Sequence, residues 1–393
     1  MATIELQVSL VLLFALAGYL LSSRINQSAV VGVIIVGIAI GPSLFHIVKY
    51  TDAIKMLAHL GAIMLLFAIG LEFKIREVYQ MRYLFIALIG IIVPWIAGYF
   101  LGVLFGYGFN ESMFIAVSLT ATSIAITAKV LEEMKKLNTP VAKAIIGAAV
   151  IDDVLGLLAL SIVIQSTKSP LPPFSKGGVG VGGITMELLT IVAKSAVFLI
   201  AGILAASSIK KLFLKMDEKE FAKKFPDFLF ITAVMFCFLY AAVAEIIGLS
   251  AIVGAFLAGA VLEGIRFKNS KDLKEGAEYL HVIFGAIFFI GLGILTNFRQ
   301  LTFNILPFFI ALLLMAVLTK LIGCGVASKL VGFSKTESFV IGVGMSPRGE
   351  VAMIVALIGL TSNIINQDIY VAIVLMSLMT TILTPLIIRN LKW

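Results

Sequence analysis

Two adjacent aspartates and a lysine interrupt long apolar runs of this sequence. Asp152 and Asp153 occur in GAAVIDDVLGLLAL, and Lys320 occurs in MAVLTKLIGCGV. An ionised side chain inside a bilayer costs at least about 2.5–3.5 kcal/mol, so each of these charges needs a reason. Neighbouring residues on a helix point about 100° apart. One carboxylate can therefore face a water-filled cavity while the other pairs with a buried ammonium, for which Lys320 is the obvious candidate.

Two further segments combine polar side chains with residues that interrupt a helix. SLTATSIAITAK is rich in hydroxyl groups, and GVGMSPRGEVAM holds three glycines and a proline beside two charges. Unwound backbone at matching places in two halves of a transporter is the best sequence pointer to a transport site. The predicted unwound residues are Thr122, Ser123, Thr127, Pro347, Arg348 and Glu350. We expect Arg348 and Glu350 to neutralise charge around the break rather than to bind an ion.

The elements that must position these residues are membrane spans. The chain has 393 residues, of which 61% are hydrophobic and 13% charged, whereas soluble proteins have about 25% charged residues. Apolar runs close to the ~20 residues that cross a bilayer recur from end to end. The sequence predicts an all-α polytopic membrane protein. Its thirteen expected spans are 4–22, 28–46, 56–71, 83–106, 112–128, 144–165, 187–208, 226–247, 249–265, 279–297, 303–328, 336–360 and 366–388.

Two long linkers divide these spans into two sets of six. Residues 166–186 are rich in Pro, Gly and Ser, and residues 209–225 are charged and amphipathic, which suits a helix on the membrane surface. We therefore expect a first half over 1–186, a linking span and surface segment over 187–225, and a second half over 226–393. The halves are offset by seven spans, an odd number, so they would be inverted repeats with broken helices in corresponding places.

The basic residues predict the orientation. With the N-terminus outside, 22 of the 30 Lys and Arg residues fall in inside segments and 5 in outside segments. Positive charge favours the cytoplasmic side, so we expect a cell (inner) membrane protein with its N-terminus outside and its C-terminus inside. The net charge of +8 is spread over short loops without a basic tail, which argues against a nucleic-acid partner.

Several segments together resemble a known family. AAVIDDVLGL, TATSIAITAKVLEE, GLSAIVGAFLAGAVL, AIFFIGLGI and GVGMSPRGEVAMIVA are similar to segments of the monovalent cation:proton antiporters, in the branch that includes bacterial sodium/proton antiporters with paired aspartates. The resemblance covers nearly the whole chain. It implies a homodimer in which each subunit has a dimerisation half and a moving six-helix core half.

The resemblance also implies roles for single residues. Asp153 would bind the cation, with Asp152 as the second carboxylate near the transported Na⁺, and Asp152 would pair with Lys320. Thr122 and Ser123 would lie in the unwound part of the fifth span. Paired aspartates accompany electrogenic exchange of Na⁺, and also Li⁺, for a larger number of protons. No resident cofactor is implied, because the cation is cargo.

Three alternatives compete with this interpretation, the first of them also a transporter. A K⁺/H⁺ antiporter stays open, because carboxylate and hydroxyl oxygens suit both ions. An intramembrane aspartyl protease needs two carboxylates that converge on one water, whereas neighbouring aspartates diverge and no other span centre carries one. A channel would need a filter loop, and no segment resembles one. We therefore expect a secondary transporter and not an enzyme.

Overall fold

The chain folds into helices throughout the part that the structure describes. A computed structural model describes residues 4–25, 27, 29–72, 80–123, 127–128, 130–131, 134–136, 138–168, 197–198, 201–202, 204–247, 249, 251–300 and 305–391. Of these, the side chains of Val150, Asp153, Val154, Ile162, Gln165, Ser166, Thr167, Lys168, Gln300 and Glu350 are not described. The described residues form no β-strand, and seven of their helices are long and apolar enough to cross a membrane.

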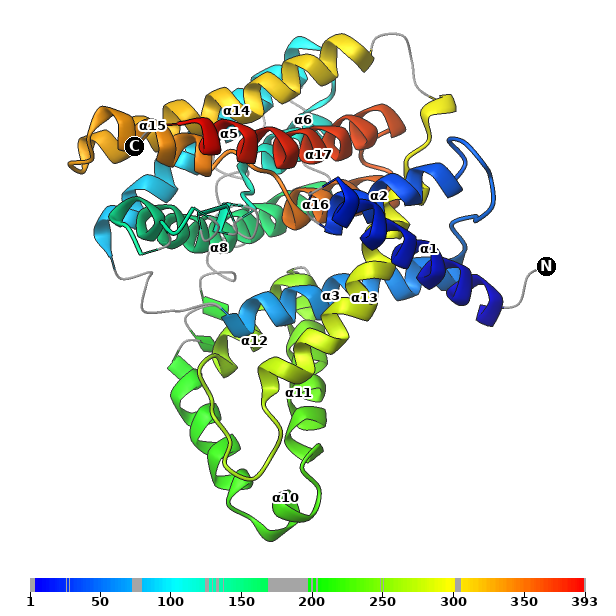
Figure 1. The fold of residues 1–393 in the computed structure, drawn as a ribbon, viewed down its shortest axis with the longest axis vertical. Helices are drawn as coiled ribbons and strands as arrows, with labels where there is room; N and C mark the ends of the chain where they lie inside the picture. The colour runs from blue at the N-terminus through cyan, green and yellow to red at the C-terminus, as the bar shows by residue number, and fades with distance from the viewer. Residues whose placement is uncertain are drawn as a thin grey trace, which may run out of the picture. The chain divides into compact units, whose positions relative to one another are not determined.

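The helices group into two compact units, each of which draws on distant parts of the sequence. Unit 1 comprises Met1–Tyr50, Arg76–Leu160 and Ile290–Trp393. Its helices are α1 (Ile4–Arg24), α2 (Ala29–Ile40), α5 (Met81–Leu104), α6 (Phe109–Thr120), α8 (Pro140–Lys168, up to Leu160), α14 (Ile305–Leu330), α15 (Lys335–Gly344), α16 (Glu350–Thr361) and α17 (Gln367–Asn390), with a short 3-10 turn η1 (Phe298–Gln300). Within it α14 packs against α5, α15 and α17, and α6 packs against α5 and α16 (Figure 1).

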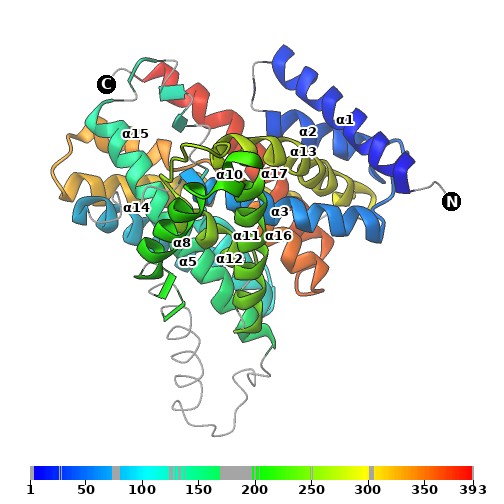
Figure 2. The ribbon, with the colours of Figure 1, turned by 90° about the horizontal axis from the view of Figure 1, so that it is seen from below.

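Unit 2 comprises Thr51–Ile75 and Ser161–Phe289. It contains α3 (Asp52–Glu72), a helix over residues 204–217, α10 (Glu220–Lys224), α11 (Phe228–Ile246), α12 (Ala251–Leu262) and most of α13 (Leu273–Leu295). The central helix α12 packs against both α3 and α11 (Figure 2). A Cβ added at Gly70 would lie 2.1 Å from the carbonyl oxygen of Phe256, and one at Gly259 2.2 Å from that of Phe67. These two glycines therefore let the backbones of α3 and α12 approach closely.

Most expected spans coincide with helices, but several ends differ. The sequence predicts the second span over 28–46, whereas α2 ends at Ile40, because Pro42 disfavours helical backbone at Gly41. The tenth span was expected from 279, yet α13 begins at Leu273, because its first turns are polar and hydropathy does not register them. Span seven, over 187–208, and the linker over 166–186 lie mostly outside the described residues.

The amphipathic segment 209–225 is not one helix. The helix over 204–217 ends at a bend, where Lys219 has extended backbone with φ −77° and ψ 152°, and α10 follows. Asp217 closes this bend, because its carboxylate accepts hydrogen bonds from the backbone N–H groups of Lys268 (2.7 Å), Asn269 (3.2 Å) and Ser270 (2.9 Å). Burial alone would raise the pKa of the Asp217 carboxyl, but these hydrogen bonds hold that pKa below its usual range.

Candidate functional site

An ion pair lies in the interior of unit 1. Asp152 comes from the middle of α8 and Lys320 from the middle of α14, and neither side chain is exposed to solvent. The Lys320 Nζ atom lies 2.9 Å from both carboxylate oxygens of Asp152. Two charge-assisted hydrogen bonds thus compensate for the desolvation of both groups. Two of the charges that the sequence singled out, Asp152 and Lys320, are therefore brought together in the fold.

Small and apolar side chains form a buried cluster on the two helices of the ion pair and on α5. The cluster includes Ile86 and Ala87 of α5, Ala148 and Ala149 of α8, and Cys324 of α14, one helical turn from Lys320. The pair therefore lies in a low-dielectric environment. Removing one of the two charges there would leave the other unpaired, at a large cost in free energy.

One glycine sets the distance between α5 and this site. A Cβ added at Gly90 would lie 2.5 Å from the Sγ atom of Cys324 and 3.8 Å from the Nζ atom of Lys320. Only a residue without a side chain fits here without displacing the cysteine. We did not single out Gly90 from the sequence, where it is one of 34 glycines.

Two interrupted helices cross next to the ion pair. The helix α6 ends at Thr120, and Ala121 has extended backbone with φ −59° and ψ 140°. The second interruption separates α15, which ends at Gly344, from α16, which begins at Glu350. The breaks expected in the fifth and twelfth spans thus include residues 121–123 and 345–349. Thr122, Ser123, Pro347 and Arg348 lie in them as expected, whereas the prediction was wrong for Thr127 and Glu350, whose backbone is helical.

Hydrogen bonds join the two interruptions. The backbone N–H of Ser123 donates to the carbonyl of Pro347 at 2.8 Å, and the Thr127 hydroxyl donates to the carbonyl of Gly344 at 2.7 Å. The Thr122 hydroxyl donates to the carbonyl of Met345 at 3.3 Å, and its side chain lies near the Asp152 carboxylate. The crossing therefore lies close to the ion pair at Thr122.

Arg348 is fully buried within the second interruption. Its guanidinium donates to the carbonyls of Met345 (3.3 Å) and Ser346 (2.9 Å) at the end of α15, and to that of Ala316 (2.8 Å) in α14. A positive charge at this end of α15 offsets its helix dipole. The backbone N–H of Arg348 donates to the Thr380 hydroxyl of α17 at 3.0 Å, a contact that the sequence analysis missed although Thr380 and Thr381 stand out in an apolar span.

Two predicted site residues are described only in part. The backbone of Asp153 lies in α8 and that of Glu350 begins α16, but both side chains lie outside the described part of the chain.

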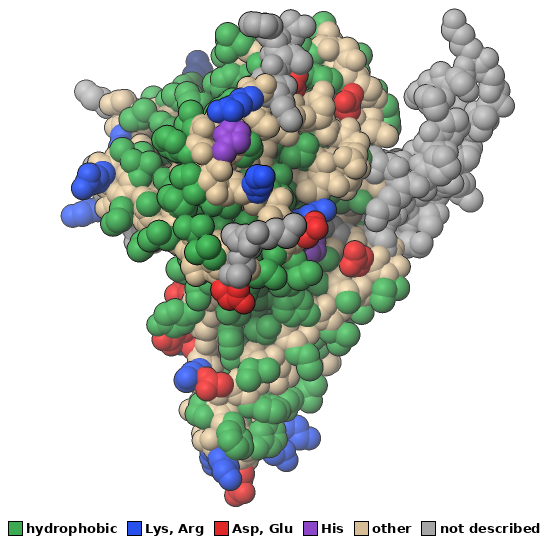
Figure 3. All heavy atoms as spheres, turned by 90° about the vertical axis from the view of Figure 1, so that its right-hand side faces the viewer, with side chains coloured by type: hydrophobic (Ala, Val, Ile, Leu, Met, Phe, Trp, Pro, Cys, Tyr) green, Lys and Arg blue, Asp and Glu red, His purple; other side chains and the backbone are tan. Residues whose placement is uncertain are grey.

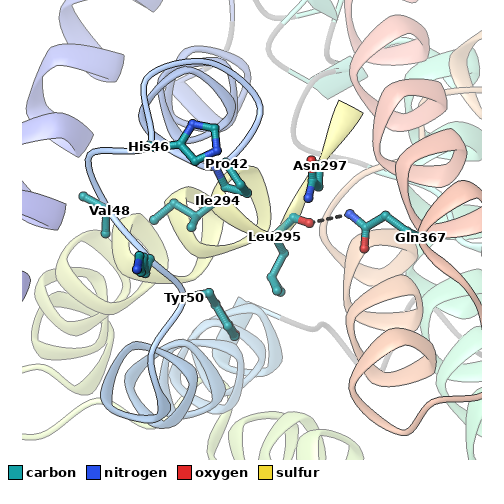
Figure 4. Close-up of a pocket in the computed structure, with 9 residues that line it drawn as sticks. Pro42, His46, Val48, Tyr50, Ile294, Leu295, Asn297 and Gln367 are labelled. Atoms are coloured by element: carbon teal, nitrogen blue, oxygen red, sulfur yellow. Dashed lines mark hydrogen bonds between the residues drawn. The ribbon is translucent and has the colours of Figure 1, made fainter. Parts of the chain in front are cut away.

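A separate cavity lies where three loops of unit 1 meet. It has a volume of about 360 Å³ and is lined by Pro42, His46, Val48, Lys49, Tyr50, Ile294, Leu295, Asn297 and Gln367 (Figure 4). The Gln367 side chain donates to the carbonyl of Leu295 at 2.6 Å, and the Ser43 hydroxyl donates to that of Thr296 at 2.5 Å. None of the lining residues belongs to the ion pair or to the crossing. The loops after α2, after α13 and before α17 therefore lie at the same end of unit 1.

Comparison with known proteins covers almost all of the chain. Residues 10–391 match the family model described as sodium/hydrogen exchanger, transmembrane. The Na(+)/H(+)-K(+) antiporter GerN of Bacillus cereus is 32% identical over 381 residues, which are 96% of this chain and 94% of that protein. A Na(+)/H(+) antiporter of Enterococcus hirae is 30% identical over 97% of this chain and 96% of its own length.

A solved structure has the same fold. The sodium proton antiporter MjNhaP1 from Methanocaldococcus jannaschii, determined at pH 8, superposes with a TM-score of 0.70 at 16% sequence identity, over 98% of this chain and 96% of that one. The buried ion pair, the crossed helix interruptions and these matches lead to one conclusion: the chain belongs to the sodium/hydrogen exchanger family of membrane transporters.

Proposed function

We propose that this transporter exchanges Na⁺, and also Li⁺, for protons, and that the two compete for Asp153 while Asp152 and Lys320 act as a switchable ion pair. The single observation that carries the proposal is the buried pair itself, in which Lys320 donates to both oxygens of Asp152 at 2.9 Å. Members of this family are transporters and not proteases, and the named relatives are sodium/proton antiporters.

The proposed cycle needs no long-range signal. In one state Asp153 is deprotonated, and the Asp152–Lys320 pair opens to admit a partly dehydrated Na⁺ between the two carboxylates. Thr122 lies beside Asp152 and can add a hydroxyl oxygen to the ligands. After the cation leaves on the other side, protons reload the site and Lys320 returns to Asp152. Access alternates as one bundle moves against the other.

The same cycle favours electrogenic exchange. Opening the pair leaves a buried ammonium without its carboxylate, and release of a proton from Lys320 removes that uncompensated charge. Asp153 releases a second proton, so more protons than cations cross in each cycle. No resident cofactor takes part.

We further propose thirteen spans in two inverted repeats, over 1–186 and 226–393, joined by residues 187–225. Two observations support this. The interrupted helices lie at corresponding places, seven spans apart, and each compact unit contains segments of both halves. A homodimer in the cell (inner) membrane is part of the proposal, as the resemblance implies.

The proposed alternation of loops between the two sides of the membrane agrees with how loops meet within each unit, and the orientation itself, with the N-terminus outside, rests on the distribution of basic residues. In unit 1 the loops after the second, tenth and twelfth spans, all expected outside, line one cavity. In unit 2 segments expected inside meet through Lys274 and Glu72 (3.0 Å) and through Asp217 and Lys268. Loops that share a side in the predicted topology thus share an end of their unit.

A K⁺/H⁺ antiporter is the second candidate. Carboxylate and hydroxyl oxygens also suit K⁺, and the relative GerN is named for both Na⁺ and K⁺. Transport in proteoliposomes separates the candidates: Na⁺, Li⁺ or K⁺ is added against an imposed pH gradient, with and without a voltage clamp. We expect Na⁺ and Li⁺ to dissipate the gradient, at a rate that responds to voltage. Dissipation by K⁺ alone would favour the second candidate, and none by any of the three would refute the proposed exchange.

A further inference from the structure

Five lysines form an unpaired cationic surface at one end of unit 2. We call Lys211, Lys215, Lys219, Lys223 and Lys224 the lysine cluster; all five are exposed. None of them forms an ion pair with another described residue. The neighbouring Lys210 differs, because it turns inward to the backbone carbonyl and the carboxylate of Glu263. The transport mechanism uses none of the five.

Large apolar side chains lie among these lysines. Leu212 is 55% exposed and Phe225 58% exposed, and the Nζ atom of Lys224 lies 5.7 Å from the centre of the Phe225 ring. Phe221 packs edge-on against Phe228, with 4.7 Å between ring centres, and both rings stay partly exposed. Cationic and apolar groups interleaved on one surface are typical of a segment at the membrane interface.

The apolar surface continues along the adjoining membrane span. On α11, Ile231, Met235 and Leu239 follow Phe228 at helical spacing and are 66%, 60% and 58% exposed. Figure 3 shows hydrophobic side chains over much of one face, with both basic and acidic side chains at the end of unit 2 that carries α10. The lysine cluster therefore lies where an exposed apolar stripe ends.

The position of the cluster is fixed by its neighbours. Asp217, which is 3% exposed, holds the loop over residues 268–270 through its carboxylate, and the side chain of Asn269 donates to the carbonyl of Asp217 at 2.7 Å. Its negative charge is thus occupied. Only Glu218 and Glu220 remain exposed within the segment to oppose the five lysines.

From this geometry we propose that the lysine cluster binds the anionic headgroups of phospholipids in the adjacent leaflet, with Phe221, Phe225 and Leu212 inserted among the first acyl carbons. Basic clusters next to a membrane span recognise anionic lipids in this way. An acidic soluble protein would pair with the lysines, but it would not account for the exposed apolar side chains that run from α11 into the cluster. The proposal concerns a lipid site and does not depend on which ion is transported.

The test measures lipid binding rather than transport. Full-length protein in a neutral detergent is titrated with short-chain phosphatidylglycerol or phosphatidylcholine, and binding is followed by the rise in Tm. We expect phosphatidylglycerol to stabilise the wild type at lower concentration. In the variant Lys211→Gln, Lys215→Gln, Lys223→Gln and Lys224→Gln, its apparent affinity should fall about tenfold or more.

Four lysines of unit 1 provide a matched control. Lys135, Lys143, Lys329 and Lys335 are also exposed, and replacing all four by Gln changes the net charge by the same amount. This variant should bind phosphatidylglycerol like the wild type. If the first variant unfolds, the pairs Lys211→Gln/Lys215→Gln and Lys223→Gln/Lys224→Gln should each give an intermediate loss.

Three outcomes would overturn the proposal. Equal stabilisation by the two lipids would show that the negative headgroup is not recognised. Equal losses in the cluster and control variants would show that only total charge matters. Complete competition by soluble glycerol phosphate would show a site for a dissolved anion rather than for a lipid.

Discussion

Removing the charge of Lys320 is the most informative perturbation of the ion pair. Lys320→Gln leaves the carboxylate of Asp152 with no ammonium, in a place where neither side chain is exposed and both oxygens had a donor at 2.9 Å. Breaking a buried pair from one side costs roughly 3–5 kcal/mol. The orphaned carboxylate can take up a proton at low pH, which removes the buried charge. The loss of stability should therefore be larger at alkaline than at acidic pH.

A double-mutant cycle measures the coupling. Tm is recorded across pH for Lys320→Gln, Asp152→Asn and the double variant. The double variant should recover part of the stability lost in Lys320→Gln, because neither charge is then left alone. Lys320→Gln should also reduce the charge moved per transport cycle. Strictly additive losses without pH dependence would refute the reasoning, since they would mean that the two side chains do not stabilise each other.

Three other predictions follow from the packing, the bend and the topology. Gly90→Ala should destabilise the protein by about 1–3 kcal/mol in thermal unfolding, because the new Cβ would lie 2.5 Å from the sulfur of Cys324. Adding Cys324→Ala should restore part of that loss. If the double variant is no more stable than Gly90→Ala, the proposed contact is contradicted. Asp217→Asn should lower Tm at pH 7, because a carboxylate with a depressed pKa stabilises the fold while it is ionised. The difference from wild type should begin to shrink below about pH 4, the ordinary pKa of an aspartate, and should vanish only below the lowered pKa of Asp217; a constant difference would point to lost packing instead. In intact cells, a cysteine at Lys215 should be protected from impermeant thiol reagents and one at Ser175 should react; the reverse labelling would overturn the orientation.

The buried charges and the helix breaks could be predicted from the sequence, because charged side chains and interrupted helices are rare within membrane spans. The placement of Asp152 beside Lys320 follows from the need of a buried ammonium for a carboxylate. The interruption at 345–349 follows from Pro347 and its flanking glycines. The helix break is local in the sequence, whereas the ion pair joins residues 168 positions apart and was predictable only because few other charges lie within the spans.

Most helix–helix contacts could not be predicted, because they join residues that are far apart in the sequence and carry no distinctive side chain. The sequence does not tell which glycine meets which neighbour, so the contacts of Gly90 with α14 and of Gly70 with α12 came only from the structure. The carbonyl of Ala316 that accepts from Arg348 carries no sequence signal at all, because every residue has a carbonyl. The end of α2 at Ile40 could have been predicted from Pro42, which hydropathy alone overlooked.

Transport by Asp153→Asn protein tests the central claim most directly. The change removes the titratable oxygen and keeps the size of the side chain, and Asp52→Asn, at an exposed aspartate of α3, is the matched control. Both variants are reconstituted in proteoliposomes after circular dichroism and gel filtration show that they fold. The account predicts normal Na⁺/H⁺ exchange by Asp52→Asn and none by Asp153→Asn. Undiminished exchange by well-folded Asp153→Asn protein would contradict it.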